Sequence, residues 1–153
     1  MKASVTSKEE ILKTCCALAA SQGLASVNMR SVAKKSGIAL GTLYNYFDNK
    51  DELLLATVEQ IWKDIFHTND TLSKDLSFPE YVAYLFESIR KGAQRYPDFL
   101  FAHSMSIAGA EKEKARSMME NCFRHIREGM LMVLQNDPRV SERAFSGTFD
   151  PSE

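Results

Sequence analysis

The side chains best suited to chemistry lie between Leu40 and Tyr46, and their types suit contact with a nucleic acid. On a helix, the outward positions of this stretch carry short or hydrogen-bonding residues: Leu40, Gly41, Thr42, Tyr44, Asn45 and Tyr46. Such groups on one helix face suit a surface that is pressed into the major groove of DNA. A plain helical hairpin with polar exposed residues would show the same pattern, so the spacing alone leaves both interpretations open.

No other group of residues has a spacing that favours catalysis or metal binding. The sequence contains no nucleophile–base pair and no phosphate-binding glycine loop. The histidines His67, His103 and His125 lie far apart, with no metal-ligand spacing among them or with Cys122. Cys122 falls on an apolar helix face, where a cysteine usually acts as a small buried hydrophobe. We therefore expect no enzyme activity, no metal and no cofactor.

Length and composition favour a small globular protein of the cytoplasm. The chain has 153 residues, of which 44% are hydrophobic and 25% charged. It has no apolar run of about 18 residues that could span a membrane, and Met1–Glu10 is polar rather than a signal-peptide core. The three cysteines, Cys15, Cys16 and Cys122, do not make a disulfide framework. These features predict a cytoplasmic protein with no membrane contact.

Charge is divided unevenly along the chain. Residues 1–50 contain seven Lys/Arg and three Asp/Glu, for a net charge of +4, whereas residues 51–153 contain twelve and seventeen, for a net charge of −5. A basic segment followed by an acidic one is typical of a DNA-binding head on a regulatory body. Ordinary scatter of charges is the alternative that this feature alone leaves open.

Short helices and a glycine turn must position the candidate side chains. Ser7 with Glu10 predicts a capping box that opens a first helix, which Gly23 ends. The apolar face of that helix carries Ile11, Cys15, Leu18 and Ala19. Asn28 is expected to cap a second helix that ends at Gly37, where glycine tolerates a positive φ. The third helix is predicted over Leu40–Phe47, with its reading portion at Gly41–Phe47.

The rest of the chain also predicts helices, and strand signals are nearly absent. Asn49 is expected to cap a long fourth helix, with Glu52 completing a capping box. Three more helices are predicted: Phe78–Tyr96, Phe99–Ala108 capped by Asp98, and Lys112–Gln135. The last residues, Asp150–Glu153, again form a helix-opening signal, and no helix follows it. We therefore expect an all-α protein whose C-terminal helices are missing from the chain shown.

The stretch from Gly37 to Leu53 resembles the signature of the TetR, or tetracycline-repressor-like, family. It reads Gly-Ile-Ala-Leu-Gly-Thr-Leu-Tyr-Asn-Tyr-Phe-Asp-Asn-Lys-Asp-Glu-Leu. The family pattern is Gly-Val-Ser-x-Gly-Thr-Leu-Tyr-x-Tyr/His-Phe-x-x-Lys-x-Glu-Leu. The resemblance covers about residues 7–55 and implies a three-helix, helix-turn-helix head at residues 1–50. It also implies a helical regulatory body at residues 51–153, incomplete at its C-terminus.

The resemblance assigns roles to individual side chains. It implies phosphate contacts by Asn28 and Lys50, and phosphate or groove contacts by Tyr44 and Tyr46. The candidates for base edges are Arg30, Leu40, Gly41, Thr42 and Asn45. Phosphate contacts would set position and give salt-dependent affinity, whereas base contacts would give sequence preference. Tyr44 could instead be mainly core, and Lys50 could be a solvated charge.

The sequence departs from the family pattern at two positions. Ala39 stands where the family usually has a Ser or Thr that caps the recognition helix, and losing such a cap costs about 1 kcal/mol. Ala19 stands where a Phe is common in the first helix, so another residue, such as Met29 or a neighbouring aromatic, must fill that part of the core. We therefore expect a recognition helix with a weak start.

The body is expected to sense a small apolar or aromatic ligand in a pocket between its helices. The candidate lining residues are Trp62, Phe66, Tyr84, Phe101, Met105, Met119 and Phe123, and Phe78, Tyr81, Phe99 and Met118 belong to the same stripe of aromatic residues and methionines. The same stripe would also fit plain core. The resemblance implies that a ligand shifts the linking helix, here Lys50–His67, and so changes the spacing of two heads in a homodimer. The resulting hypothesis is a repressor that binds a double-stranded operator and is released by its ligand. The alternative is a truncated interaction protein that keeps its head and dimerises poorly.

Overall fold

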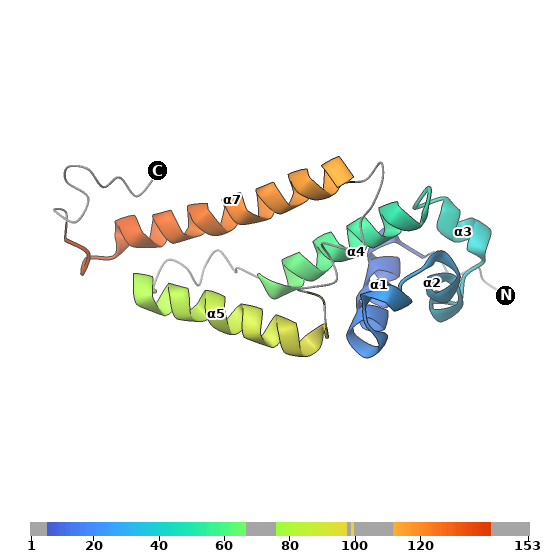
Figure 1. Ribbon diagram of the computed structural model, residues 1–153, viewed down its shortest axis with the longest axis horizontal. Coiled ribbons are helices and arrows are strands. Elements are labelled where there is room, and N and C mark those ends of the chain that lie inside the picture. The colour runs from blue at the N-terminus through green and yellow to red at the C-terminus, as the bar shows by residue number, and fades with distance from the viewer. Residues whose placement is uncertain (1–5, 67–75, 98, 100–111, 142–153) are drawn as a thin grey trace.

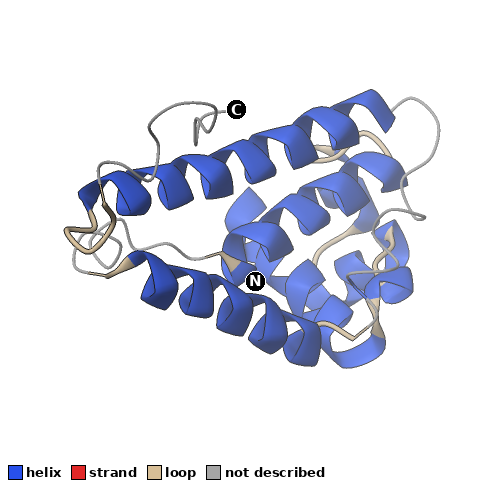
Figure 2. Cartoon of the chain, turned by 60° about the vertical axis from the view of Figure 1, so that its left-hand side comes forward, coloured by secondary structure: helices blue, strands red, loops and turns tan. Residues whose placement is uncertain are grey.

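The computed structural model describes residues 6–66, 76–97, 99 and 112–141, and in these residues the protein is all-α (Figures 1 and 2). The regular elements are α1 (Lys8–Gln22), the short 3₁₀ helix η1 (Leu24–Ser26), α2 (Met29–Ser36), α3 (Leu40–Tyr44), α4 (Lys50–Ile65), α5 (Phe78–Arg95) and α7 (Lys112–Asn136). None of these helices is long and apolar enough to cross a membrane. The predicted all-α class is confirmed.

Two of the expected caps form as predicted. The Ser7 hydroxyl accepts a hydrogen bond from the Glu10 amide at 3.2 Å, and the Glu10 carboxylate accepts one from the Ser7 amide at 3.1 Å. Asn28 caps α2 in the same reciprocal way with Ser31. Both helices end at glycines with positive φ, Gly23 at 81° and Gly37 at 67°.

The start of α4 differs from the prediction in one bond. Asn49 is the cap, and its side chain accepts from the Glu52 amide at 2.8 Å. The Glu52 carboxylate does not return to Asn49. It accepts instead from the amide of Asp48, at 2.7 Å. Because Glu52 reaches one residue further back, it satisfies the amide that precedes the cap and ties the turn after α3 to α4.

The third helix is shorter than expected and ends at Tyr44, not at Phe47. Asn45 is its C-cap residue. The Tyr46 amide then donates to the Leu43 carbonyl three residues earlier, as in a 3₁₀ turn. This turn points the Phe47 side chain into the core, where it is fully buried. Burying this aromatic ring favours leaving the helical path early.

A single cluster of buried side chains extends from the head into the body. It includes Ile11 and Cys15 of α1 and the α4 residues Leu53, Val58 and Ile61. Its last members are Trp62, Ile65, Tyr96 and Phe99. Helix α4 therefore lies between the two parts of the chain and belongs to the core of both, as its central place in Figure 1 suggests.

In the body, the N-terminal half of α5 packs against the C-terminal half of α7, and the two helices diverge toward the head (Figure 1). Tyr81 and Leu85 of α5 and Val133 of α7 form a second, smaller core. At Gly129 the two helices approach closely, because a Cβ there would overlap the Tyr81 hydroxyl. Val133 is the only described α7 residue before Asp137 that is fully buried, so α7 is mostly a half-exposed helix.

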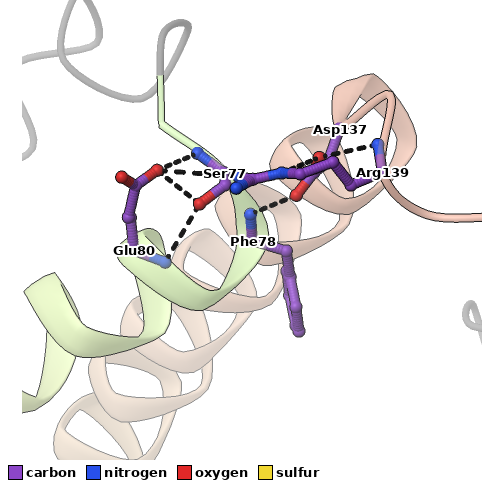
Figure 3. Close-up of polar contacts among 5 residues, drawn as sticks. All are labelled: Ser77, Phe78, Glu80, Asp137 and Arg139. Atoms are coloured by element: carbon purple, nitrogen blue, oxygen red, sulfur yellow. Dashed lines mark hydrogen bonds and ion pairs between the residues drawn. The ribbon is translucent and has the colours of Figure 1, made fainter.

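A polar cluster joins the end of α7 to the start of α5 (Figure 3). The Asp137 carboxylate accepts from the Phe78 amide at 2.8 Å and from the Arg139 amide at 3.0 Å. Ser77 caps α5 in a capping box with Glu80, and Arg139 lies 3.7 Å from the Glu80 carboxylate. The backbone hydrogen bonds from Phe78 and Arg139 hold the pKa of Asp137 below its ordinary value.

Some predicted elements lie outside the described residues. Of the helix expected at Phe99–Ala108, only Phe99 is described, and it is buried. Asp98, which was expected to cap that helix, and the helix-opening signal at Asp150–Glu153 are not described. These predictions therefore stay predictions.

Candidate nucleic-acid interface

Helices α2 and α3 meet at a turn built on Gly37. Its left-handed conformation allows the Gly37 amide to donate to the Lys34 carbonyl at 3.3 Å and the Ile38 amide to donate to the Ala33 carbonyl at 3.1 Å. Ala33 is buried at this junction and Ile38 packs against the core. The arrangement gives α3 one buried side, through Leu43, and one side that faces out.

The outward side of α3 carries two exposed side chains with large apolar parts. Leu40 is 38% exposed and Tyr44 is 49% exposed. This exposure rules out the alternative in which Tyr44 is mainly core. Thr42 is half-buried, and Asn45 is exposed at the end of the helix. The side chains expected to face outward are therefore at least partly accessible to another molecule.

Gly41 lies on the same side, and nothing in the part of the chain that the structure describes requires a glycine there. A Cβ built on Gly41 would meet no atom within 4 Å, and its backbone is not in the left-handed region. Glycine in a helix costs up to about 1 kcal/mol relative to alanine. A glycine without an internal reason on an exposed helix face therefore points to close approach by an external partner.

Two residues that the resemblance assigns to DNA contact are used inside the head. The Asn28 side chain accepts from the amides of Arg30 and Ser31 and donates to the Ser26 carbonyl at 3.2 Å. The Tyr46 hydroxyl donates to the Thr6 carbonyl at 2.6 Å, and its ring packs against the core. Both side chains thus hold local structure, Asn28 at the start of α2 and Tyr46 against the N-terminal arm.

The cationic side chains predicted to contact DNA are exposed to solvent. Arg30 in the first turn of α2 and Lys50 in the first turn of α4 are exposed. Two further exposed lysines, Lys34 and Lys35, lie in the last turn of α2. In the sequence, only the net positive charge of residues 1–50 indicates a role for them. By contrast, Lys8 lies over the Phe47 ring, 5.0 Å from its centroid. The head therefore offers cations from two helix starts and one helix end.

The weak start of α3 is as expected. Ala39 is the cap residue, and no side chain accepts a hydrogen bond from the first amides of the helix. Ala19 and Met29 are both buried in the large core cluster. The first amides of α3 lack a side-chain acceptor, and an external acceptor such as a phosphate would suit them.

The body contains an open groove of about 890 Å³ between α4 and the N-terminal half of α7. Its apolar part is formed by the α4 residues Leu55 and Trp62 with Phe66 on one side, and by Met118, Cys122 and Ile126 on the other. The Trp62 and Phe66 rings are stacked, 5.5 Å apart. Charged and polar side chains line the rest: Glu59, Lys63, Glu113, Lys114, Ser117, Asn121 and His125.

The groove brings together only part of the predicted pocket. Trp62 and Phe66 line it, whereas Tyr84 and Met119 do not, and Phe123 is 59% exposed on another side of α7. The reason is helical rotation: Phe123 follows the groove residue Cys122 and points about 100° away from it. The other two candidates, Phe101 and Met105, lie outside the described residues.

The cysteine thiols do not form a reactive site. Burial raises the pKa of the Cys15 thiol to about 11 and that of the Cys16 thiol to about 12, so both stay protonated at neutral pH. Burial also raises the pKa of Cys122. Within the ranges that the structure describes, no three His, Cys, Asp or Glu side chains form a group that could hold a metal ion.

Comparison with known proteins gives a match in this head. Residues 7–57 match the model of the family described as bacterial regulatory proteins, tetR family. An uncharacterised HTH-type transcriptional regulator of Haemophilus influenzae is 30% identical, over 72% of this chain and 74% of that protein.

Two further similarities were found. The HTH-type transcriptional repressor KstR of Rhodococcus jostii is 29% identical over 76% of this chain, which spans 57% of that repressor's length. A solved structure of a putative TetR-family transcriptional regulator from Vibrio parahaemolyticus is 24% identical, with a TM-score of 0.43, over 78% of this chain and 68% of the other. The helix-turn-helix head matches the family model, and the Haemophilus regulator is similar over most of its length. The chain therefore belongs to the TetR family of bacterial regulatory proteins and is a transcriptional regulator.

Proposed function

We propose that this chain is a cytoplasmic transcriptional repressor that reads operator DNA with the exposed side of α3. Residues 1–50 form the DNA-binding domain and residues 51–153 the regulatory domain. Leu40, Gly41, Thr42 and Asn45 lie against base edges, together with Arg30. Lys50 and Tyr44 contact phosphates, while Asn28 and Tyr46 act indirectly by fixing α2 and the N-terminal arm.

The exposed side of α3 is the observation that carries this proposal. It combines a partly exposed leucine, a half-exposed tyrosine and a glycine whose missing side chain serves no internal packing. The KstR relatives bear the name of repressors, which supports the sign of regulation proposed here. Two heads are needed to read two half-sites, so the working form is a homodimer.

The groove between α4 and α7 is the proposed effector site. Its stacked Trp62 and Phe66 rings favour a flat apolar or aromatic ligand, and the polar groups along its edge would orient that ligand. Because α4 starts at Lys50 in the head and carries the groove residues near its other end, a ligand that moves α4 would move the head.

DNA binding is tested with a duplex selected by the purified full chain from a random-sequence pool. Fluorescence anisotropy of the labelled duplex over a salt series should give an affinity that falls as salt rises. Lys50→Ala should reduce the slope of log affinity against log salt by about one, because one phosphate contact is lost. Lys91→Ala, which removes an exposed cation of α5 outside the groove, is the matched control and should leave the slope unchanged.

The selected sequence and the state of assembly complete the test. A homodimer should select two related half-sites, and sedimentation should show two chains per duplex. A chain that enriches no sequence, or whose binding is the same for Lys50→Ala and wild type at every salt concentration, would contradict the proposed reading surface. A monomer that binds a single half-site would contradict the homodimer.

A further inference from the structure

The last turn of α5 is attached to the core that the head shares with α4. Tyr96, which follows α5 directly, is buried, and its hydroxyl donates to the Asp64 carboxylate of α4 at 2.9 Å. The other carboxylate oxygen of Asp64 accepts from the Gln60 side chain at 3.1 Å. Burial and the bond to Asp64 raise the pKa of the Tyr96 hydroxyl, so it remains a donor at all ordinary pH values.

The same tyrosine also adjoins α1. Its side chain lies beside the Cys16 thiol, and both residues belong to the large core cluster. Asp64 is close enough to Cys16 for its charge to contribute to the raised pKa of that thiol, behind the effect of burial. One side chain of the body thus touches the connecting helix and the first helix of the head.

A glycine brings α5 close enough for this contact. A Cβ on Gly92 would lie 2.6 Å from Cγ1 of Ile65, closer than real side chains pack. The α5 backbone therefore lies directly against the end of α4, one turn before Tyr96. Since Ile65 is buried, it has little room to move aside. The relative position of the two helices is set tightly at this crossing.

The effector groove begins on the opposite side of the same turn of α4. Trp62 lines the groove, stacks on Phe66, and meets the Phe99 ring at 5.4 Å in an edge-to-face contact. Phe99 in turn contacts the Tyr96 ring, 6.2 Å away. Packed aromatic rings therefore form a continuous path from the groove to Tyr96.

We propose that Tyr96 is a positioning residue that couples the groove to the DNA-binding head. By bonding to Asp64 and packing on Cys16, it holds the end of α5, the end of α4 and α1 in one arrangement. The head then responds to the body through this contact as well as through the covalent continuity of α4. This inference rests on the proposed function, because the coupling connects the proposed effector groove to the proposed DNA surface.

The chain has a single tryptophan, and it lies at this joint. Coupling between two sites is reciprocal, so DNA binding at the head must act back on the groove. Trp62 emission is recorded while the selected duplex is added, with excitation at the long-wavelength edge of indole absorption. Anisotropy of the labelled duplex is measured in parallel. Wild-type protein should show an emission change that saturates together with the anisotropy.

Three variants separate coupling from folding. Tyr96→Phe removes only the hydroxyl, and it should bind the duplex while losing at least about half of the emission change, with DNA affinity shifted by about fivefold, the usual effect of one hydrogen bond. Tyr84→Phe removes the same atom from a half-buried tyrosine elsewhere on α5 and should behave as wild type. Asp64→Asn keeps an acceptor for Tyr96 and should also keep the response, since Gln60 can turn its amide.

The outcomes distinguish the two proposals. Absence of duplex binding by anisotropy would overturn the proposed function and this inference with it. Duplex binding without an emission change in wild type, or an undiminished change in Tyr96→Phe, would overturn the coupling alone. Should Tyr96→Phe not fold, as judged by its thermal transition, Asp64→Ala removes the same bond from the other side. A wild-type emission change in that variant would overturn the coupling.

Discussion

Replacing Gly41 by alanine should separate fold from function in the head. A Cβ at this position would meet nothing within 4 Å, so the methyl group causes no internal overlap. Alanine is favoured over glycine in a helix by up to about 1 kcal/mol, and we expect about half of that near the start of so short a helix. The melting temperature should therefore stay level or rise by about 1–2 °C.

The same methyl group should weaken DNA binding. If α3 lies in the major groove, the added carbon stands between the helix backbone and the base edges and costs about the value of one base contact. That value is about 1–3 kcal/mol, or about five- to 150-fold in affinity. The loss should appear at every salt concentration without a change in slope, because no phosphate contact is removed.

Thermal unfolding and duplex anisotropy, measured on one preparation, check both halves of this prediction. Gly37→Ala is the contrasting variant, since φ is 67° there and alanine should lower stability by about 1 kcal/mol. Wild-type affinity in Gly41→Ala would refute the close approach of α3 to DNA. A marked loss of stability would refute the view that this glycine has no internal role.

Other variants test other parts of the structure. Ala39→Ser should supply the missing cap of α3 and raise the free energy of unfolding by about 0.5–1 kcal/mol in denaturant titrations. Tyr46→Phe removes the bond to Thr6 and should lower it by about 1 kcal/mol, measured in the same way. Gly92→Ala should overpack the crossing with Ile65 and lower it by about 1–3 kcal/mol. The pKa of Asp137 is lowered in the folded protein, so its contribution to stability is complete above its ordinary value of 3.8 and is lost as the pH falls below it. Asp137→Asn should therefore lower stability at neutral pH and flatten the acid limb of a plot of melting temperature against pH.

The head could be predicted closely from the sequence because its signals are local. The capping box at Ser7 and the glycine stop at Gly37 join residues no more than four apart, and both are present in the structure. The exposed side of α3 followed from helical periodicity in the same way. The length of α3 could not be predicted from the sequence, because its early end depends on burial of Phe47 in a core built from other helices.

Contacts between distant residues could not be predicted. Tyr46 bonds to Thr6 across 40 residues, and Asp137 caps α5 across 59. Neither residue shows its partner in the sequence. The lining of the groove depends on which face of α7 points toward α4. Several faces of α7 are partly apolar, so helical periodicity does not determine which one does. Trp62, Phe66 and Met118 are therefore among the predicted lining residues, whereas Cys122 and Ile126 are not.

The attachment of α7 at Asp137 has a mechanical consequence for the groove. Helix α7 has 25 residues and is tied to α5 at its C-terminal end, whereas the groove residues lie along its N-terminal half. At 1.5 Å per residue such a helix is about 37 Å long, so a tilt of about 5° about the tied end moves the other end by about 3 Å. A rotation too small to disturb the Asp137 hydrogen bonds would thus open or close the groove by nearly the thickness of an aromatic ring. The Asp137 carboxylate and the packing of Tyr81 against Gly129 and Val133 together fix the end about which α7 can tilt.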